Sequence, residues 1–497
     1  MSSPGAAATH TLPTRDDRTT APTADATRRS TRSLHARWGV VVAIGAGVWL
    51  APPPPGVDAA AWRLLAIFLA TIAGLMLQPL PVGAMALVGL TTAAITRTVP
   101  VAQILSGYSE SSVWMVLAAF ILSRAMIKTG FGRRVALLFI RFVGHTSLGL
   151  SYALVGADAV LGLVIPSTGA RSGGVIFPIA KSISDACDSQ PGPTARRLGA
   201  YLMVTLYQSD MVVAAMFLTA QASNPLIARL ARQSAHVDLG YGRWALAMSV
   251  PGPVALLAVP ALLYRIFPPE IARTPAAAER SRDELRRLGP LSRDEWLMLA
   301  MFAGITVLWA TIPWHGIDYA VVALAGVSVL LVTRVLAWDD VLSEKAGWDV
   351  FVWYGAVFLM ARALGDTGIT TWFAGLASSS TAGWHWSAAV AALLLLYFYA
   401  HYMFASITAH VAAMYVPFLV VMLASGAPPY LTVLLLTVCS NLSAALTHYG
   451  TTNAPLYFGA GYVTQRTWWR LGFTASLVAM TIFLTLGVAW WKFLGWW

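Results

Sequence analysis

Charged residues are scarce in this chain, at 11% of 497 residues, whereas hydrophobic residues make up 57% and the mean hydropathy is +0.66. Soluble globular domains carry about 25% charged residues, so this composition excludes an ordinary soluble protein. Cysteine is scarce too. Cys187 and Cys439 are the only two and show no paired spacing, which excludes a disulfide framework and disfavours a zinc site. The histidines lack metal-ligand spacing, so no metal or cofactor is predicted.

Long apolar runs recur along the whole chain. Each suffices for the roughly 20 helical residues that cross about 30 Å of hydrocarbon. The runs around residues 160–185 and 404–424 are interrupted by glycine or proline, which is tolerated at membrane depth only where the backbone faces protein or water. The sequence therefore predicts an all-α polytopic membrane protein with two re-entrant helical hairpins.

Arginine gathers in residues 15–37 and 265–293, and the positive-inside rule places both segments in the cytoplasm. Residues 1–38 are predicted to form a disordered cytoplasmic tail. A retained first span over 39–58 follows, because prolines replace a signal-cleavage site. Residues 268–294 are predicted to be a cytoplasmic basic linker. Neither cluster has interleaved aromatics, so nucleic-acid binding is not predicted.

Two stretches in opposite halves of the chain nearly repeat each other: PSTGARSGGVIFP from Pro166 and ASITAHVAAMYVP from Ala405. A proline follows each serine by eleven residues, and a potentially cationic residue, Arg171 or His410, follows it by four. An arginine-bearing segment precedes each motif, and a polar break follows it, TAQASNPL from Thr219 and THYGTTNAPLYFG from Thr447. The chain is therefore interpreted as repeat 1 over 59–267 and repeat 2 over 295–497.

Parity of the spans predicts how the repeats are oriented. One leading span and five spans per repeat give about eleven crossings, with the basic linker inside and the C-terminus outside. An odd number per repeat inverts the second repeat relative to the first, so the two serine tips meet near the membrane midplane.

Such a meeting point favours an anion, because helix N-termini present free N–H groups and a positive dipole end. Duplicated donors suit a guest with a carboxylate at either end. Two readings stay open: the hydroxyl groups only cap broken helices, and Arg171 is a snorkelling surface arginine. The predicted substrate-binding residues are Ser167, Thr168, Gly169, Ser223, Asn224, Ser406, Thr408, Thr451, Thr452 and Asn453, with Arg171 and His410 as fixed cations.

Two carboxylates, Asp158 and Asp210, fall in apolar segments of repeat 1. Either could couple transport to protons. The favoured interpretation is structural pairing with an arginine such as Arg124 or Arg171.

The paired serine motifs, TAQASNPL and THYGTTNAPLYFGAGYV resemble the divalent-anion/sodium symporter family, in particular its citrate/succinate, tartrate/succinate and 2-oxoglutarate/malate exchanger branch. The likeness covers roughly residues 60–495. It implies a homodimer in the lipid bilayer, an elevator motion and a small di- or tricarboxylate substrate. The usual Ser-Asn-Thr tip of the family falls on Ser167, Thr168 and Gly169, and on Ser406, Ile407 and Thr408.

Both asparagines of that tip are missing, and Ile407 supplies no side-chain oxygen for sodium. Arg171 and His410 suggest tethered cations in place of a mobile one, and an unpaired charge at the midplane penalises empty return by at least about 2.5–3.5 kcal/mol. The prediction is thus a sodium-independent anion exchanger of the plasma membrane. The alternatives are a sodium- or proton-coupled symporter and, remotely, a membrane-embedded acyltransferase using His401, His410 or His448 as base.

Overall fold

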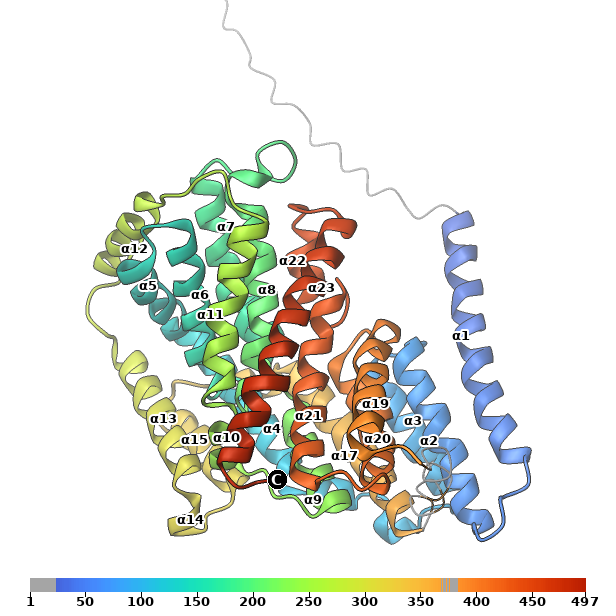
Figure 1. The fold of residues 1–497 in the computed structure, drawn as a ribbon. Coiled ribbons are helices and arrows are strands. Elements are labelled where there is room, and N and C mark those ends of the chain that lie inside the picture. The colour runs from blue at the N-terminus through green and yellow to red at the C-terminus, as the bar shows by residue number, and fades with distance from the viewer. Residues whose placement is uncertain (1–23, 368, 370–371, 373–374, 376–382) are drawn as a thin grey trace, which may run out of the picture.

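The computed structural model describes residues 24–367, 369, 372, 375 and 383–497 (Figure 1). Within these ranges the regular secondary structure is helical, apart from an isolated bridge between Thr146 and Arg273. The predicted all-α class is confirmed.

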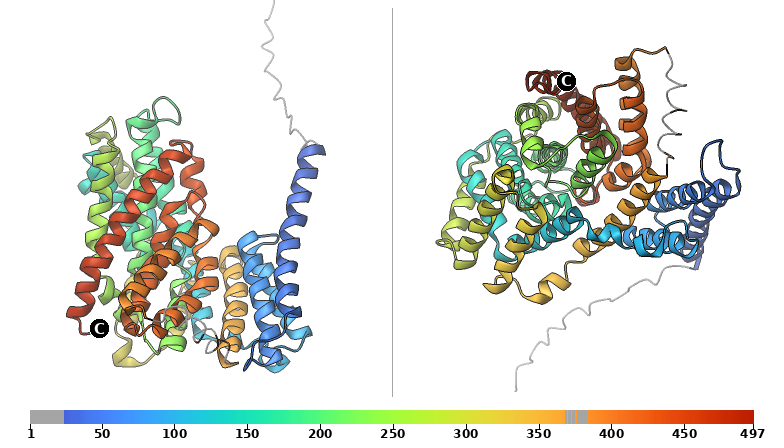
Figure 2. Two further views of the ribbon diagram at one scale, coloured as in Figure 1. Left: turned by 45° about the vertical axis from the view of Figure 1, so that its right-hand side comes forward. Right: turned by 90° about the horizontal axis from the view of Figure 1, so that it is seen from below.

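One group of helices runs across the molecule, from α1, α2 and α3 on one side, through α17 and α4, to α15, α13, α5 and α12 on the opposite side (Figures 1 and 2). Helix α17 packs against α2, α3 and α4, and α4 packs against α15. The elements of this group, with the connecting segments, are α1 (Ala24–Leu50), α2 (Ala59–Leu77), α3 (Val82–Ile95), η1 (Val101–Gln103), η2 (Ser106–Ser109), α4 (Ser111–Thr129), α5 (Phe131–Val143), α12 (Pro275–Leu288), α13 (Arg293–Ala310), α14 (Ile312–His315), α15 (Tyr319–Val332), α16 (Trp338–Leu342) and α17 (Lys345–Asp366).

A second group of elements lies around α8, in which every residue is buried, with α19 and α20 packed on α21 at the edge of this group. A helix that is apolar on all sides has to lie inside a helical assembly, and α8 packs against α6, α11 and α21. These elements are α6 (Ser147–Gly162), η3 (Gly169–Ile176), α7 (Phe177–Ala186), η4 (Ala195–Arg197), α8 (Gly199–Met216), α9 (Asn224–Ala235), α10 (Tyr241–Met248), α11 (Pro251–Ile266), α19 (Trp386–Ala400), η5 (His401–Met403), α20 (Ile407–Ala424), α21 (Pro429–Leu442), η6 (Ser443–Leu446), α22 (Ala454–Gly459), α23 (Gln465–Ile482), η7 (Phe483–Gly487) and α24 (Val488–Phe493).

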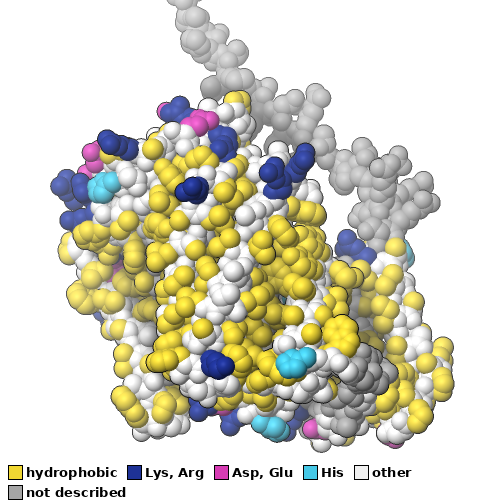
Figure 3. All heavy atoms as spheres, viewed as in Figure 1, with side chains coloured by type: hydrophobic (Ala, Val, Ile, Leu, Met, Phe, Trp, Pro, Cys, Tyr) yellow, Lys and Arg dark blue, Asp and Glu magenta, His cyan; other side chains and the backbone are white. Residues whose placement is uncertain are grey.

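On the face shown in Figure 3, hydrophobic side chains cover a broad belt, and most charged side chains lie toward the two ends of the molecule. Of the described helices, six are long and apolar enough to cross a membrane, or seven if the pair α10 and α11, bent by 49°, counts as one span. Four shorter apolar helices accompany them. The fold is that of a polytopic membrane protein, and the number of eleven crossings stays a prediction.

Helix α1 begins at Ala24, so residues 24–38 are helical and not a disordered tail, and residues 1–23 lie outside the described residues. A helix that is already nucleated in an apolar segment extends readily through Ala, Arg and Leu, which have high helix propensity.

Both predicted hairpins are present as helix, break and returning helix. In hairpin 1, α6 ends before Pro166, which cannot continue a helix, and the chain returns through the π-helical η3 and α7. In hairpin 2, α19 and η5 lead to a break at Phe404–Ser406, and α20 returns. Hairpin 1 occupies the upper part of Figure 1 and hairpin 2 the lower part.

Candidate functional site

The tip of hairpin 1 lies against the polar break of the other repeat, the loop 447–453. A Cβ atom added at Gly169 would stand 3.0 Å from Thr452 Oγ1 and 3.6 Å from Ser167 Oγ. Beyond the tip, the Ser172 and Tyr457 hydroxyl groups are 2.8 Å apart. The structure thus brings together Ser167 and Thr452, which the sequence places in different repeats.

The same loop also contacts hairpin 2. The Nε2 atom of His401 lies 3.2 Å from the Gly450 carbonyl oxygen, and the Tyr449 hydroxyl donates to the Tyr402 carbonyl oxygen. Loop 447–453 therefore joins the two serine-bearing hairpins.

Four of the predicted hydroxyl-bearing side chains remain at least partly open to a guest. Thr452 is exposed, and Ser167, Ser406 and Thr408 are half-buried. Ser167 Oγ accepts from the Ala170 N–H at 3.1 Å, so it takes the capping role left open above. Ser406 precedes α20 without a side-chain capping bond.

Arg171 lies at the centre of a buried ion-pair cluster. Its Nε donates to Asp158 Oδ1 at 2.8 Å, and its Nη2 donates to Asp210 Oδ1 at 2.5 Å. Its Nη1 donates to two backbone carbonyl oxygens, those of Ile165 in the hairpin tip and Ala220 in the break 217–223. The guanidinium therefore fastens the tip to the break of its own repeat.

This geometry corrects the prediction that Arg171 carries an uncompensated charge. Asp158 and Asp210 neutralise it, and the side chain is fully buried, so the snorkelling alternative is also wrong. The register of each helix decides whether Arg171 is paired. Asp158 on α6 and Asp210 on α8 reach it because both lie on the helix face that is turned toward the tip of hairpin 1. Arg124, the other partner considered, lies 4.0 Å from Asp340 instead.

Asn453 connects this cluster to loop 447–453. Its Nδ2 donates to Asp210 Oδ2 at 2.7 Å, and its Oδ1 accepts from Thr451 Oγ1 at 2.5 Å. Both side chains are buried, so Thr451 and Asn453 support the loop while Thr452 is the one of the three that is exposed.

His410 is buried between the arms of hairpin 2. Its ring lies 4.3 Å from that of Tyr397 on α19, and its Nδ1 lies 3.2 Å from His401 Nδ1. Like Arg171, it ties the returning arm of its hairpin to the first arm. The structure places its side chain in the hairpin interior rather than at the tip surface.

Ser223 and Asn224, the predicted substrate-binding residues of the first polar break, differ in their hydrogen bonds. Asn224 Nδ2 donates to the Ala214 and Phe217 carbonyl oxygens, and its Oδ1 accepts from Asn441 Nδ2 at 3.0 Å. Because these bonds use its amide, direct substrate binding by Asn224 is not supported by this conformation. Ser223 and Thr168 are buried, and Ser223 Oγ has no partner among the described residues.

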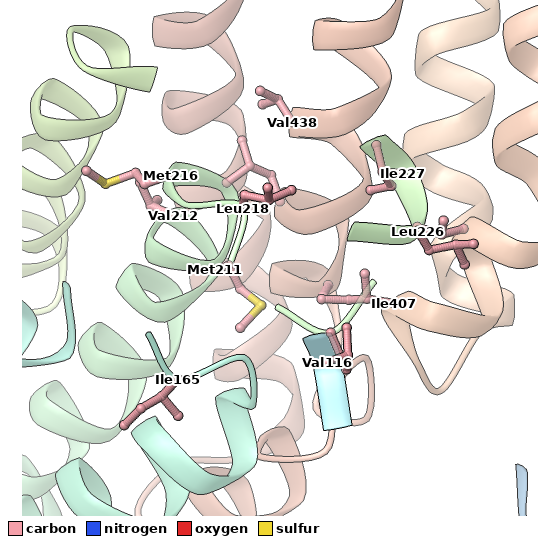
Figure 4. Packing of buried hydrophobic residues seen from close by; sticks show 14 of the residues in the cluster. Val116, Ile165, Met211, Val212, Met216, Leu218, Leu226, Ile227, Ile407 and Val438 are labelled. Atoms are coloured by element: carbon pink, nitrogen blue, oxygen red, sulfur yellow. The ribbon is translucent and has the colours of Figure 1, made fainter. Parts of the chain in front are cut away.

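Ile407, which stands where the family resemblance places an asparagine, lies in apolar surroundings. Its side chain is 1% exposed and lies beside Val116, near Leu226 and Ile227 (Figure 4). It offers no oxygen to a cation.

The sequence prediction missed three residues that shape the site. Tyr207 donates to the Ala444 carbonyl oxygen at 2.7 Å, Tyr457 bonds to hairpin 1, and His401 holds His410. The sequence could have indicated Tyr457, because it belongs to the duplicated break THYGTTNAPLYFG. Nothing in the sequence indicates which face of its helix carries Tyr207.

Residues 32–497 match the family model described as "Sodium:sulfate symporter transmembrane region". The chain belongs to this family. The resemblance to divalent-anion/sodium symporters is thereby confirmed, and the acyltransferase alternative is dropped because the family and its relatives are named as transporters.

Curated relatives span nearly the whole chain. The chain is 44% identical to the putative malate transporter YflS of Bacillus subtilis, over 92% of this chain and 96% of the relative. It is 44% identical to chloroplastic dicarboxylate transporter 1 of Arabidopsis thaliana, covering 92% and 82%, and 32% identical to the L-tartrate/succinate antiporter of Shigella sonnei, covering 91% and 97%. Among solved structures, the YdaH transporter of Alcanivorax borkumensis shares the fold, with TM-score 0.55 and 14% identity over 95% of this chain and 98% of that one.

Proposed function

We propose that the protein exchanges dicarboxylate anions across the plasma membrane without sodium. The observation that carries this proposal is the position of Arg171 Nη1, which takes up the carbonyl oxygens of Ile165 and Ala220. Backbone carbonyl oxygens at broken helices are the ligands with which transporters coordinate sodium. In this protein the guanidinium of Arg171 binds these carbonyl oxygens in place of a sodium ion.

The substrate class follows from the relatives and the open hydroxyl groups. Malate, tartrate and succinate, which appear in the names of the relatives, are dianions with a carboxylate at either end. We assign Ser167 and Thr452 to one carboxylate and Ser406 and Thr408 to the other. Thr168, Gly169, Ser223, Asn224, Thr451 and Asn453 shape the site around them.

Exchange follows from hydrogen bonding instead of net charge. An empty site that crossed the membrane midplane would carry these donors without partners, and each stranded buried donor costs about 1–3 kcal/mol. A bound dianion satisfies them, so loaded return is favoured. The Shigella sonnei relative, named an antiporter, supports this mode.

Family membership supports a homodimer that works by an elevator motion. An inverted repeat is supported by the opposite placement of the two hairpins (Figure 1). The basic linker helix α12 and the start of α1 lie at one end of the molecule, and the C-terminus lies at the other. We assign the first end to the cytoplasm and the C-terminus to the outside.

The test of the substrate class is competition in proteoliposomes loaded with malate. Unlabelled succinate, malate, tartrate, 2-oxoglutarate, citrate and sulfate would each be added outside against labelled malate. We expect the dicarboxylates to compete. Competition by sulfate with none by dicarboxylates would contradict the assignment.

A further inference from the structure

The cluster around Arg171 has unequal numbers of acids and bases. It holds two carboxyl groups and one guanidinium, and the side chains of Arg171 and Asp210 are 0% exposed and that of Asp158 is 5% exposed. If both carboxyl groups were ionised, the cluster would carry one net negative charge inside the membrane-embedded core.

The hydrogen bonds around the cluster indicate where a proton would sit. Asp210 uses Oδ1 for Arg171 and Oδ2 for Asn453, and Asp158 uses Oδ1 for Arg171. The two Oδ1 atoms accept from Nε and Nη2 on one edge of the guanidinium, so the two carboxyl groups lie side by side, in position to hydrogen-bond each other. Two carboxyl groups can do so only when one of them carries a proton.

Other groups near the pair cannot balance the charge. The charged and titratable side chains that act on it are Arg171 from η3, Tyr207 from α8 and Tyr457 from α22. Tyrosine is neutral near pH 7, which leaves Arg171 as the only cation that forms an ion pair with Asp158 or Asp210 in the described part of the chain. An uncompensated buried charge is strongly unfavourable.

We propose that Asp158 and Asp210 hold one proton between them and that this resident proton makes the hairpin 1 cluster neutral. Its consequence for transport rests on the proposed function: hairpin 1 crosses the membrane freely only with the proton in place. Through Asn453 and Thr451, the same cluster positions the loop that carries Thr452. Exchange should therefore fall about tenfold per pH unit once the pair deprotonates.

The variant Asp158→Asn tests this consequence. An amide oxygen accepts from Arg171 and an amide N–H donates to Asp210, so the substitution imitates the protonated carboxyl group. We expect this variant to retain exchange and to lose the decline seen in the wild type at high pH. The matched control is Asp185→Asn on the same hairpin, whose carboxylate pairs with Lys181 at the surface and which should keep the wild-type profile. Titration of His410 is common to all three proteins and cancels in the comparison.

Infrared spectroscopy tests the proton without any transport. Wild-type protein at neutral pH should show the C=O band of a protonated carboxyl group, which disappears in Asp158→Asn and persists in Asp185→Asn. A wild-type spectrum without that band, or an Asp158→Asn profile as steep as the wild-type profile, would overturn the proposal. If the band is present while no dicarboxylate exchange occurs at any pH, the resident proton stands and the proposed function fails.

Discussion

Arg171 fastens four parts of repeat 1 to one another. Each bond it makes ends on a different part of repeat 1: α6, the hairpin tip, the break 217–223 and α8. Removal of this guanidinium leaves two buried carboxyl groups without their cation and two carbonyl oxygens without this donor.

Substitution of Arg171 should therefore reduce stability more than substitution of a surface base. We expect Arg171→Gln to lower the free energy of unfolding by about 3–5 kcal/mol, the usual effect of removing one partner of a buried ion pair. Lys128, whose side chain is 43% exposed in its pair with Asp340, is the control, and Lys128→Gln should change stability by about 0–1 kcal/mol. Equal thermal shifts of the two purified variants would contradict the structural role of Arg171.

Thr452 is the exposed residue of loop 447–453. Its substitution should therefore change substrate affinity and leave the stability of the protein unchanged. We expect Thr452→Val, which removes the hydroxyl group at nearly constant volume, to weaken dicarboxylate binding by about 1–2 kcal/mol. Thr474→Val on α23, whose hydroxyl bonds to its own helix, serves as control. The measurement is malate affinity by calorimetry together with the unfolding temperature, and unchanged affinity in Thr452→Val would remove this residue from the site.

At the scale of elements, α4 and α17 are joined by reciprocal ion pairs. Glu110, before α4, pairs with Arg362 near the end of α17, whereas Asp340, before α17, pairs with Lys128 at the end of α4. Helices whose opposite ends pair in this way are antiparallel. Arg124 and Arg362 are the matched residues of the duplicated segment, which supports inverted repeats.

The Asp340 pair also predicts a dependence of stability on pH. The hydrogen bond from Lys128, with that from the Ala337 N–H, lowers the pKa of Asp340 below the ordinary value of 3.8. Because the pKa of Asp340 is lower in the folded protein, the ion pair stabilises the fold fully at pH values above the ordinary pKa. This stabilisation is lost as the pH falls through the lowered pKa of the folded protein. Asp340→Asn should thus be less stable than the wild type near neutral pH and equally stable in strong acid. Asp339→Asn, at an exposed neighbour, should match the wild type at both pH values, and a constant deficit for Asp340→Asn would contradict the ion-pair explanation.

Much of the arrangement of elements could be predicted, because glycine and proline breaks and their spacing are local properties of the sequence. The hairpins, the polar breaks after them and the apolar character of the helices belong to this group. The partners of Arg171 could be narrowed to Asp158 and Asp210 but not assigned, since a one-residue change of register turns a helical side chain by about 100°. The burial of Asn224 and His410 likewise depends on tertiary packing, which spacing does not reveal.

At the scale of the whole molecule, the hydrophobic belt of the face in Figure 3 and the opposite placement of the two hairpins in Figure 1 fit the proposed membrane carrier. The number of crossings was hard to predict because several spans are broken or short, such as α6 and the bent pair α10 and α11. The central claim is that a loaded site crosses the membrane and that sodium has no part in the step.

Uptake of labelled malate into proteoliposomes tests that claim most directly, with vesicles loaded with malate or empty and with sodium or choline outside. We predict rapid uptake into loaded vesicles at the same rate in both salts, and little uptake into empty vesicles in either. Robust uptake into empty vesicles that requires external sodium would contradict the account.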